Sequence, residues 1–233
     1  MASRAATFHG GYSGALLAPP RYVAYLTLLL AGLLLAAWVI DTFLVFKIWR
    51  DCVQPLEVAI TTTASAVDGA YGLPFLRAQG VAWATGLYHA LFVASAIEQI
   101  ITADPHALTP FDQTVQRFFV SLLPAIQVVM LATKLYGLRL ALWLSAIAPI
   151  VLGYAVDMID GLVERSIRRY SGGRESATLY HRAKYAIAGA VGLWLFAYVC
   201  LPMPIELRSS SWVAAAVIGL LSRLQWKYYK KYV

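Results

Sequence analysis

The sequence has little charge for its length. Only 13% of its 233 residues are charged, whereas soluble domains carry about 25%. Hydrophobic residues make up 60% of the chain, and the mean hydropathy is +0.65. So few charged side chains cannot cover the surface of a water-soluble enzyme or keep a chain disordered. The composition therefore predicts an integral membrane protein, and 233 residues suit one domain.

Motifs for catalysis and for ligand binding are also scarce. The sequence has no Gly-rich phosphate loop and no serine in a nucleophile-elbow motif. The four histidines have no cysteine or carboxylate at metal-ligand spacing, so we predict no metal and no cofactor. Cys52 and Cys200 lie in different regions, and no disulfide is expected. We therefore predict a protein that is not an enzyme and has no catalytic residues.

Charge-poor apolar runs are what the sequence has in quantity. A helix that crosses a ~30 Å hydrocarbon core needs about 20 apolar residues. The runs cover 22–40, 79–97, 118–133, 141–156, 185–205 and 209–222. The second and last runs are the weakest, and Lys134–Arg139 is expected to form a tight hairpin turn between the third and fourth. These runs predict an all-α fold, a polytopic transmembrane helical bundle of about six spans, with four to six left open.

Basic residues predict the orientation, because cytoplasmic loops hold an excess of Lys and Arg. With six spans and a cytoplasmic N-terminus, 13 of the 19 basic residues lie inside. We then expect 1–21 to be a cytoplasmic segment and 22–233 to be one transmembrane domain, with both termini in the cytoplasm of a bacterium. Its 164–184 stretch would be a basic cytoplasmic loop. Residues 47–117 either include a crossing helix or form a helical layer outside the membrane.

Acidic residues near the runs have two interpretations. A charge in lipid costs several kcal/mol unless it is paired, but Asp41 and Glu98 lie near run ends, where we expect them to be interfacial and within reach of water. Asp157 and Asp160 lie three residues apart on one helical face. We expect them to pair with basic residues, Arg165 or Arg182, and to take no part in catalysis.

The stretch 164–184 is the most informative. The helix that begins near Ala141 is expected to run past the membrane surface, with a Glu164–Arg168 pair and basic residues in its last turn. It should end at Gly172-Gly173, because glycine adopts the left-handed C-cap conformation at little cost. A capped loop that merely retains positive charge inside and a surface that docks a partner both fit this pattern.

One run in this stretch is distinctive, Glu164-Arg165-x-x-Arg168-Arg169-x-x-Gly172-Gly173-Arg174-Glu175-Ser176, followed by Tyr180-His181-x-Ala183-Lys184. It resembles the hallmark segment of the integrating-conjugative-element membrane-protein family, which is similar to the TraJ-type membrane proteins of conjugative plasmids. The resemblance implies an inner-membrane component of a conjugative type IV secretion apparatus, with the coupling-protein ATPase as partner. The docking candidates are Glu164, Arg165, Arg168, Arg169, Gly172, Gly173, Arg174, Glu175, Tyr180, His181 and Lys184.

Two other functions remain as alternatives. The first is a small-molecule transporter or channel subunit. The second is a membrane phosphotransferase, because Asp157-x-x-Asp160-Gly161-x-x-x-Arg165 resembles the start of the CDP-alcohol phosphotransferase signature, although no further aspartate follows Asp160. Other partners are the lipid bilayer and further transfer-apparatus proteins, and self-association is compatible with the pattern. The basic and aromatic segment 226–232 is interpreted as an interfacial anchor, so we predict no sequence-specific binding of nucleic acid.

Overall fold

The computed structural model describes residues 11–50, 52–69, 74–104, 109–171 and 177–229. No strand occurs in these ranges, so the expected all-α fold class is confirmed there. The long helices are α1 (Gly11–Phe43), α6 (Leu123–Ser145), α7 (Ile147–Tyr170), α8 (Ala177–Cys200) and α9 (Leu207–Lys227). The shorter ones are α2 (Gln54–Gly69), α3 (Pro74–Tyr88), α4 (Ile97–Thr102) and α5 (Pro110–Ser121), with π-helical segments η1 (Leu44–Ile48) and η2 (His89–Val93).

Three stretches of the described chain are long and apolar enough to cross a membrane. They are Arg21–Ile48, Leu123–Tyr170 and Thr178–Cys200. The expected run 79–97 is not one helix, because α3 gives way to η2 and Ala96 adopts a left-handed conformation with φ 60°. The last run lies within α9, which is not among the three stretches. A membrane protein is thus supported, whereas six spans are not confirmed.

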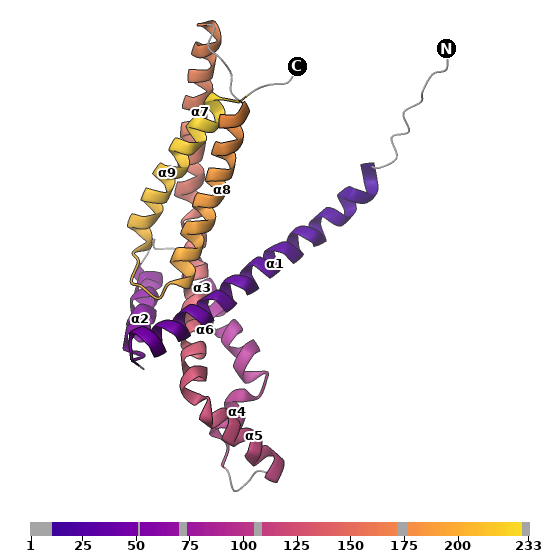
Figure 1. Cartoon of the computed structure of the whole chain (residues 1–233), viewed down its shortest axis with the longest axis vertical. Helices are drawn as coiled ribbons and strands as arrows, with labels where there is room; N and C mark the ends of the chain where they lie inside the picture. Colours follow the sequence, from indigo (N-terminus) through magenta and orange to yellow (C-terminus); the bar gives the residue numbers. More distant parts are fainter. Residues whose placement is uncertain (1–10, 51, 70–73, 105–108, 172–176, 230–233) are drawn as a thin grey trace, which may run out of the picture.

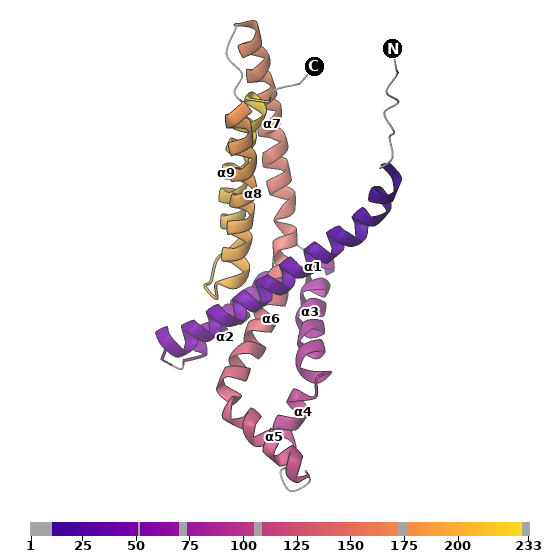
Figure 2. The same ribbon diagram turned by 45° about the vertical axis from the view of Figure 1, so that its right-hand side comes forward.

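The expected hairpin turn at Lys134–Arg139 is wrong. Helix α6 continues through this segment, the break comes only at Ala146, and α7 then leads on in a similar direction (Figures 1 and 2). Gly137 serves a close helix contact there, since a Cβ atom on it would lie 2.6 Å from the Cα atom of Ala84 in α3. The third and fourth apolar runs therefore belong to one stretch of 48 residues.

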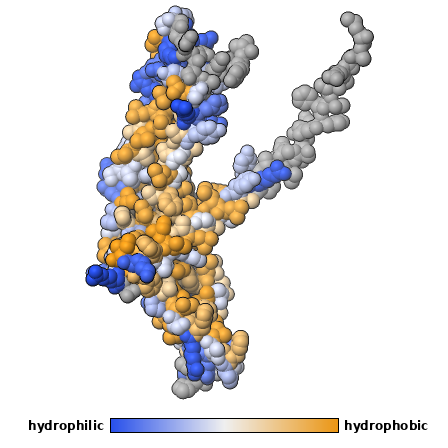
Figure 3. Space-filling model, in the orientation of Figure 1, coloured by the Kyte–Doolittle hydropathy of each residue, from blue (hydrophilic) through white to orange (hydrophobic). Residues whose placement is uncertain are grey.

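The helices form two groups joined by this long stretch. At one end α9 packs along α7 and α8, and at the other α3 packs on α6 with α4 and α5 beyond it (Figures 1 and 2). Helix α1 crosses α6 and α8 obliquely near the middle. Hydrophobic side chains cover the middle of the face in Figure 3, and hydrophilic ones gather where α7, α8 and α9 meet the end of the molecule.

A buried arginine fixes the crossing of α1, α6 and α8. Arg139 is only 1% exposed, and its guanidinium donates to the backbone carbonyl of Tyr198 at 2.9 Å and to those of Leu201 and Met203. These carbonyls lie where α8 ends, so the arginine takes the place of the missing helical donors. Asp41, only 2% exposed, lies near enough for its charge to interact with Arg139. The expectation that Asp41 is within reach of water is therefore wrong, because the side chain is buried beside Arg139, whereas its placement at the membrane interface stays a prediction.

Two polar contacts reinforce the same crossing. The Trp38 indole N–H donates to the Thr133 hydroxyl at 3.0 Å, and the Tyr136 hydroxyl donates to the Leu30 carbonyl at 2.8 Å. Each contact joins α1 to α6 across about a hundred residues of sequence. These two polar side chains therefore find their partners on another helix, as is usual for polar groups away from water.

Helices α7 and α9 approach each other through glycines. A Cβ atom on Gly161 would lie 2.5 Å from the Arg223 carbonyl oxygen, and one on Gly153 would lie 3.0 Å from that of Ala215. Small residues allow helix backbones to come this close, which is common where helices pack in membranes. The pairing of α7 with α9 places the charged ends of both helices side by side.

Candidate functional site

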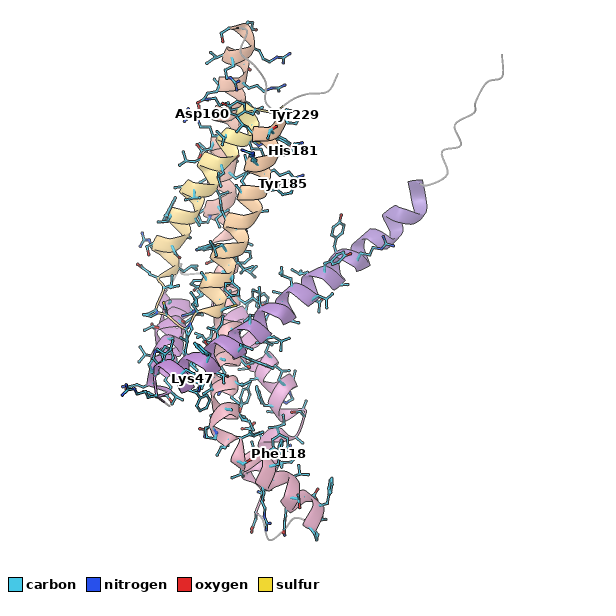
Figure 4. All side chains as sticks on the ribbon, viewed as in Figure 1. Lys47, Phe118, Asp160, His181, Tyr185 and Tyr229 are labelled. Carbon is cyan, nitrogen blue, oxygen red and sulfur yellow. The ribbon has the colours of Figure 1, made fainter. Side chains whose placement is uncertain are left out.

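The candidate site is the end of the bundle where α7 stops, α8 starts and α9 stops. We call it the basic end and define it by Asp160, Glu164, Arg165, Arg168, Arg169, Tyr180, His181, Arg182, Lys184, Arg223, Lys227, Tyr228 and Tyr229. In Figure 4 the labelled members Asp160, His181 and Tyr229 lie together at this end, whereas Lys47 and Phe118 lie far from it. Three segments that are distant in the sequence therefore contribute to one surface.

Carboxylates of α7 hold the cations of α9. Arg223 Nε lies 2.7 Å from Glu164 Oε1 and 3.0 Å from Asp160 Oδ2, and Lys227 Nζ lies 2.6 Å from Glu164 Oε2. The hydrogen bonds that Arg223 donates to the Glu164 carboxylate raise the pKa of the guanidinium above its ordinary value. Asp160 therefore does pair with an arginine, but with Arg223 in place of the expected Arg165 or Arg182. The partner comes from α9, which the sequence spacing does not reveal.

Arginines of α7 lie on the rings that follow α9. The Arg168 guanidinium carbon is 4.3 Å from the ring centre of Tyr228, and that of Arg165 is 5.2 Å from the ring centre of Tyr229. Such cation–π contacts are attractive because the ring face is electronegative. The Tyr180 ring packs edge-on to Tyr229 with centroids 5.5 Å apart, which joins the start of α8 to the same cluster.

A second contact fixes the last turn of α9. The Trp226 indole N–H donates to the hydroxyl of Tyr154 in α7 at 3.0 Å. The aromatic residues at 226–229 therefore bind other parts of the same chain. An interfacial anchoring role stays a prediction, and these contacts give the segment a structural role as well.

The structure separates the docking candidates into three groups. Glu164, Arg165 and Arg168 are partly buried and engaged with the end of α9, and Tyr180 is partly buried beside them. Exposed candidates are Arg169, His181 and Lys184. Gly172, Gly173, Arg174 and Glu175 lie outside the described residues.

The end of α7 agrees closely with the sequence prediction. Its last helical residue is Tyr170, and the Ser171 backbone N–H donates to the Ile167 carbonyl at 3.1 Å. Exposed neighbours that the candidate set omitted are Tyr170, which is 94% exposed, and Arg182. The spacing of Arg223 and Lys227 places both on one face of α9, but it does not show that this face meets Glu164.

The chemistry available at the basic end is electrostatic. In the described part of the chain, no group of three or more His, Cys, Asp or Glu side chains is placed to hold a metal. Asp160 is paired with Arg223, and Asp157 packs against Gly219 of α9. The outer surface of this end therefore consists of exposed cations. The partly buried charges and aromatic rings beneath them hold the ends of α7 and α9 together.

We expect Glu164→Gln to loosen the contact between α7 and the end of α9. The substitution keeps the side-chain size but weakens the links to Arg223 and Lys227, so the last turn of α9 should open more often. Limited trypsin digestion of the detergent-solubilised protein should then cleave after Arg223 and Lys227 a few-fold faster. Cleavage after Lys47, which is exposed at a distant site, is the internal control. Unchanged cleavage at α9 would contradict the structural role of Glu164.

A comparison with protein families identifies the kind of protein. Residues 77–230 match the family model described as IncC plasmid conjugative DNA transfer protein DtrJ-like. The match covers 154 of 233 residues, from 77 to 230 inclusive. The chain belongs to the DtrJ-like family. No curated protein and no solved structure matched the sequence.

The DtrJ-like family points to a role in conjugative DNA transfer. The expectation of a conjugation protein is therefore confirmed at that level. The finer resemblance to integrating-conjugative-element and TraJ-type membrane proteins stays a hypothesis. The match includes α6 to α9 and with them the whole described part of the basic end.

Proposed function

We propose that this DtrJ-like protein is a non-enzymatic inner-membrane component of a conjugative type IV secretion apparatus, and that it docks the coupling-protein ATPase. The exposed cations of the basic end, Arg169, Arg182 and Lys184, would make the contact, together with His181. Membership in a conjugative DNA-transfer family supports the setting. The gathering of exposed cations near the end of α7 and the start of α8 supports the docking surface, and it is the observation on which the proposal chiefly depends.

The distribution of charge supports a cytoplasmic location for this end. Cations cluster where α7 and α9 end and α8 begins, and membrane proteins retain Lys and Arg on the cytoplasmic side. A coupling ATPase would meet the protein there. Because the sequence has no phosphate-binding loop, ATP hydrolysis would come from that partner. Arginine is well suited to bind an acidic surface, since its planar guanidinium pairs with carboxylates in bidentate fashion.

Charge reversal of the exposed cations tests the proposal. We expect the triple variant Arg169→Glu, Arg182→Glu, Lys184→Glu to retain about a tenth or less of the ATPase in pull-downs from solubilised membranes. Three exposed ion pairs at about 0.5 kcal/mol each give this factor. Binding by the unmodified protein should also weaken as salt is raised.

A matched control variant reverses three positive charges at other positions. This control combines Lys47→Glu, Arg117→Glu and Arg208→Glu, at exposed residues away from the basic end. We expect it to leave the amount of ATPase in the pull-down unchanged. Both triple variants must reach the membrane fraction in equal amounts. Full ATPase recovery with the first triple variant would refute docking at the basic end.

A further inference from the structure

A groove of about 490 Å³ runs between α8 and α9, which pack side by side (Figures 1 and 2). Leu193, Trp194 and Ala197 of α8 contribute to one wall, and Val213 and Val217 of α9 contribute to the other. The volume is within the range of sites that bind small organic molecules. The groove is therefore large enough to hold a ligand between the two helices.

The groove opens on the opposite side of α9 from α7. Ala215 and Gly219 of α9 contact α7. Val213 and Val217 each lie two residues earlier, which corresponds to about 200° around a helix. In the described part of the chain only α8 and α9 line the groove, so its outer side is open to the surroundings.

The lining offers few polar atoms to a ligand. None of the described residues that form it is charged, and its two serines are bonded within α9. The Ser209 hydroxyl donates to the Glu206 carbonyl at 3.2 Å, and the Ser210 hydroxyl donates to the Leu207 carbonyl at 3.1 Å. A polar ligand would lose its hydrogen bonds to water here without replacement. The groove therefore favours a hydrocarbon chain.

The groove lies on a helix that is able to cross a membrane. Thr178–Cys200 of α8 is one of the three stretches that are long and apolar enough, and the groove residues Ala190–Ala197 lie in its charge-free second half. On α9 the groove extends over Ser209–Ile218, about 14 Å of helix, which is roughly half of a ~30 Å hydrocarbon core. In a bilayer its open side therefore faces the acyl chains of one leaflet.

A carboxylate lies at one mouth of the groove. Glu206 is exposed, and its backbone carbonyl accepts a hydrogen bond from the Ser210 backbone N–H at 3.1 Å. Glu206 is thus one helical turn before Ser209 and Ser210, which line the groove. Arg208 is also exposed, but it precedes Ala215 by two turns and so shares the side of α9 that meets α7. The charge next to the groove is therefore negative.

We propose that this groove binds one acyl chain of a phospholipid whose headgroup carries a primary ammonium group. The chain lies between α8 and α9, and the ammonium group meets the Glu206 carboxylate at the membrane surface. A phospholipid fits both features of the site, because it combines a hydrocarbon chain with a charged end and is present at this level of the membrane. This inference does not depend on the docking of an ATPase.

Photo-crosslinking in proteoliposomes tests the chain site. The full chain is reconstituted with phosphatidylethanolamine that carries a diazirine in one acyl chain, and labelled peptides are mapped by mass spectrometry. We expect several-fold more label on the groove segments 190–197 and 209–218 than on residues 22–29 of α1, which are exposed. Ala190→Phe with Ala197→Phe should reduce the groove label several-fold, because both alanines line the groove and the rings would fill it.

A matched control places the same rings outside the groove. Ala188→Phe with Ala216→Phe changes exposed alanines of α8 and α9 that do not line the groove, and it should leave the label unchanged. The comparison with α1 needs no substitution, so it holds even if a variant fails to fold. Groove label no greater than the α1 label, or groove label that survives both phenylalanines in a folded variant, would overturn the proposal.

A change of headgroup tests the role of Glu206. Phosphatidylglycerol with the same diazirine chain lacks the ammonium group, and it should label the groove several-fold less than the phosphatidylethanolamine probe. Glu206→Gln should remove this preference, whereas Arg208→Gln, an exposed control two residues away, should preserve it. Equal labelling by the two probes in the unmodified protein, or a preference that persists in the Glu206→Gln variant, would overturn the assignment of an ammonium headgroup.

Discussion

Replacing Arg139 by methionine is expected to destabilise the protein by about 3–5 kcal/mol, the usual effect of removing one partner of a buried charged network. The substitution removes the donors to the carbonyls at the end of α8 and leaves Asp41 buried without its counter-charge. In detergent the melting temperature should fall by roughly 10 °C, using the scaling for domains of this size. Thermal unfolding followed by intrinsic fluorescence measures it.

A double substitution separates charge from packing. Asp41→Asn in the Arg139→Met background should recover part of the lost stability, because the uncompensated carboxylate is gone. Lys134→Met is the matched control in the same helix, since Lys134 is exposed and its ammonium nitrogen lies 4.4 Å from the centre of the Tyr88 ring. If the Arg139→Met variant had the same melting temperature as the unmodified protein, the buried cation would have no role in holding α1, α6 and α8 together.

Gly161→Ala is expected to destabilise the protein by about 1–3 kcal/mol, the range typical of overpacked interiors. The new methyl group would lie 2.5 Å from the Arg223 carbonyl oxygen, and backbone cannot move aside as a flexible side chain can. Helices α7 and α9 would have to separate. Thermal unfolding of the solubilised protein again gives the value.

The control for this prediction has the opposite sign. Gly189 lies in α8 with open space where a Cβ atom would be, so Gly189→Ala should leave stability unchanged or raise it by up to about 1 kcal/mol through helix propensity. Equal effects at the two glycines would mean that the close approach of α7 and α9 does not matter for stability.

The sequence predicted the features that depend on local composition. Apolar runs locate α1 and α8, and the glycine pair at 172–173 correctly indicated that α7 would end nearby, at Tyr170. The number of spans was harder to predict from the sequence. The run 79–97 is interrupted by the left-handed backbone conformation of Ala96, and no residue type in the run indicates this break.

Features that depend on distant partners were not predictable in this way. Lys134, Gly137 and Arg139 together are typical of a turn, yet Gly137 fits against α3 and Arg139 binds the end of α8. Either role requires knowing which helices meet. The partners of Glu164 could not be predicted for the same reason, because they lie on α9.

The length of the continuous stretch α6–α7 has a mechanical consequence. Its 48 residues correspond to about 72 Å of helix, more than twice the ~30 Å hydrocarbon core of a bilayer. A rod of this length cannot be contained in lipid, and only the single joint at Ala146 interrupts it. Where this stretch crosses a bilayer, one or both of its ends must therefore project beyond the hydrocarbon core into the headgroup region or water.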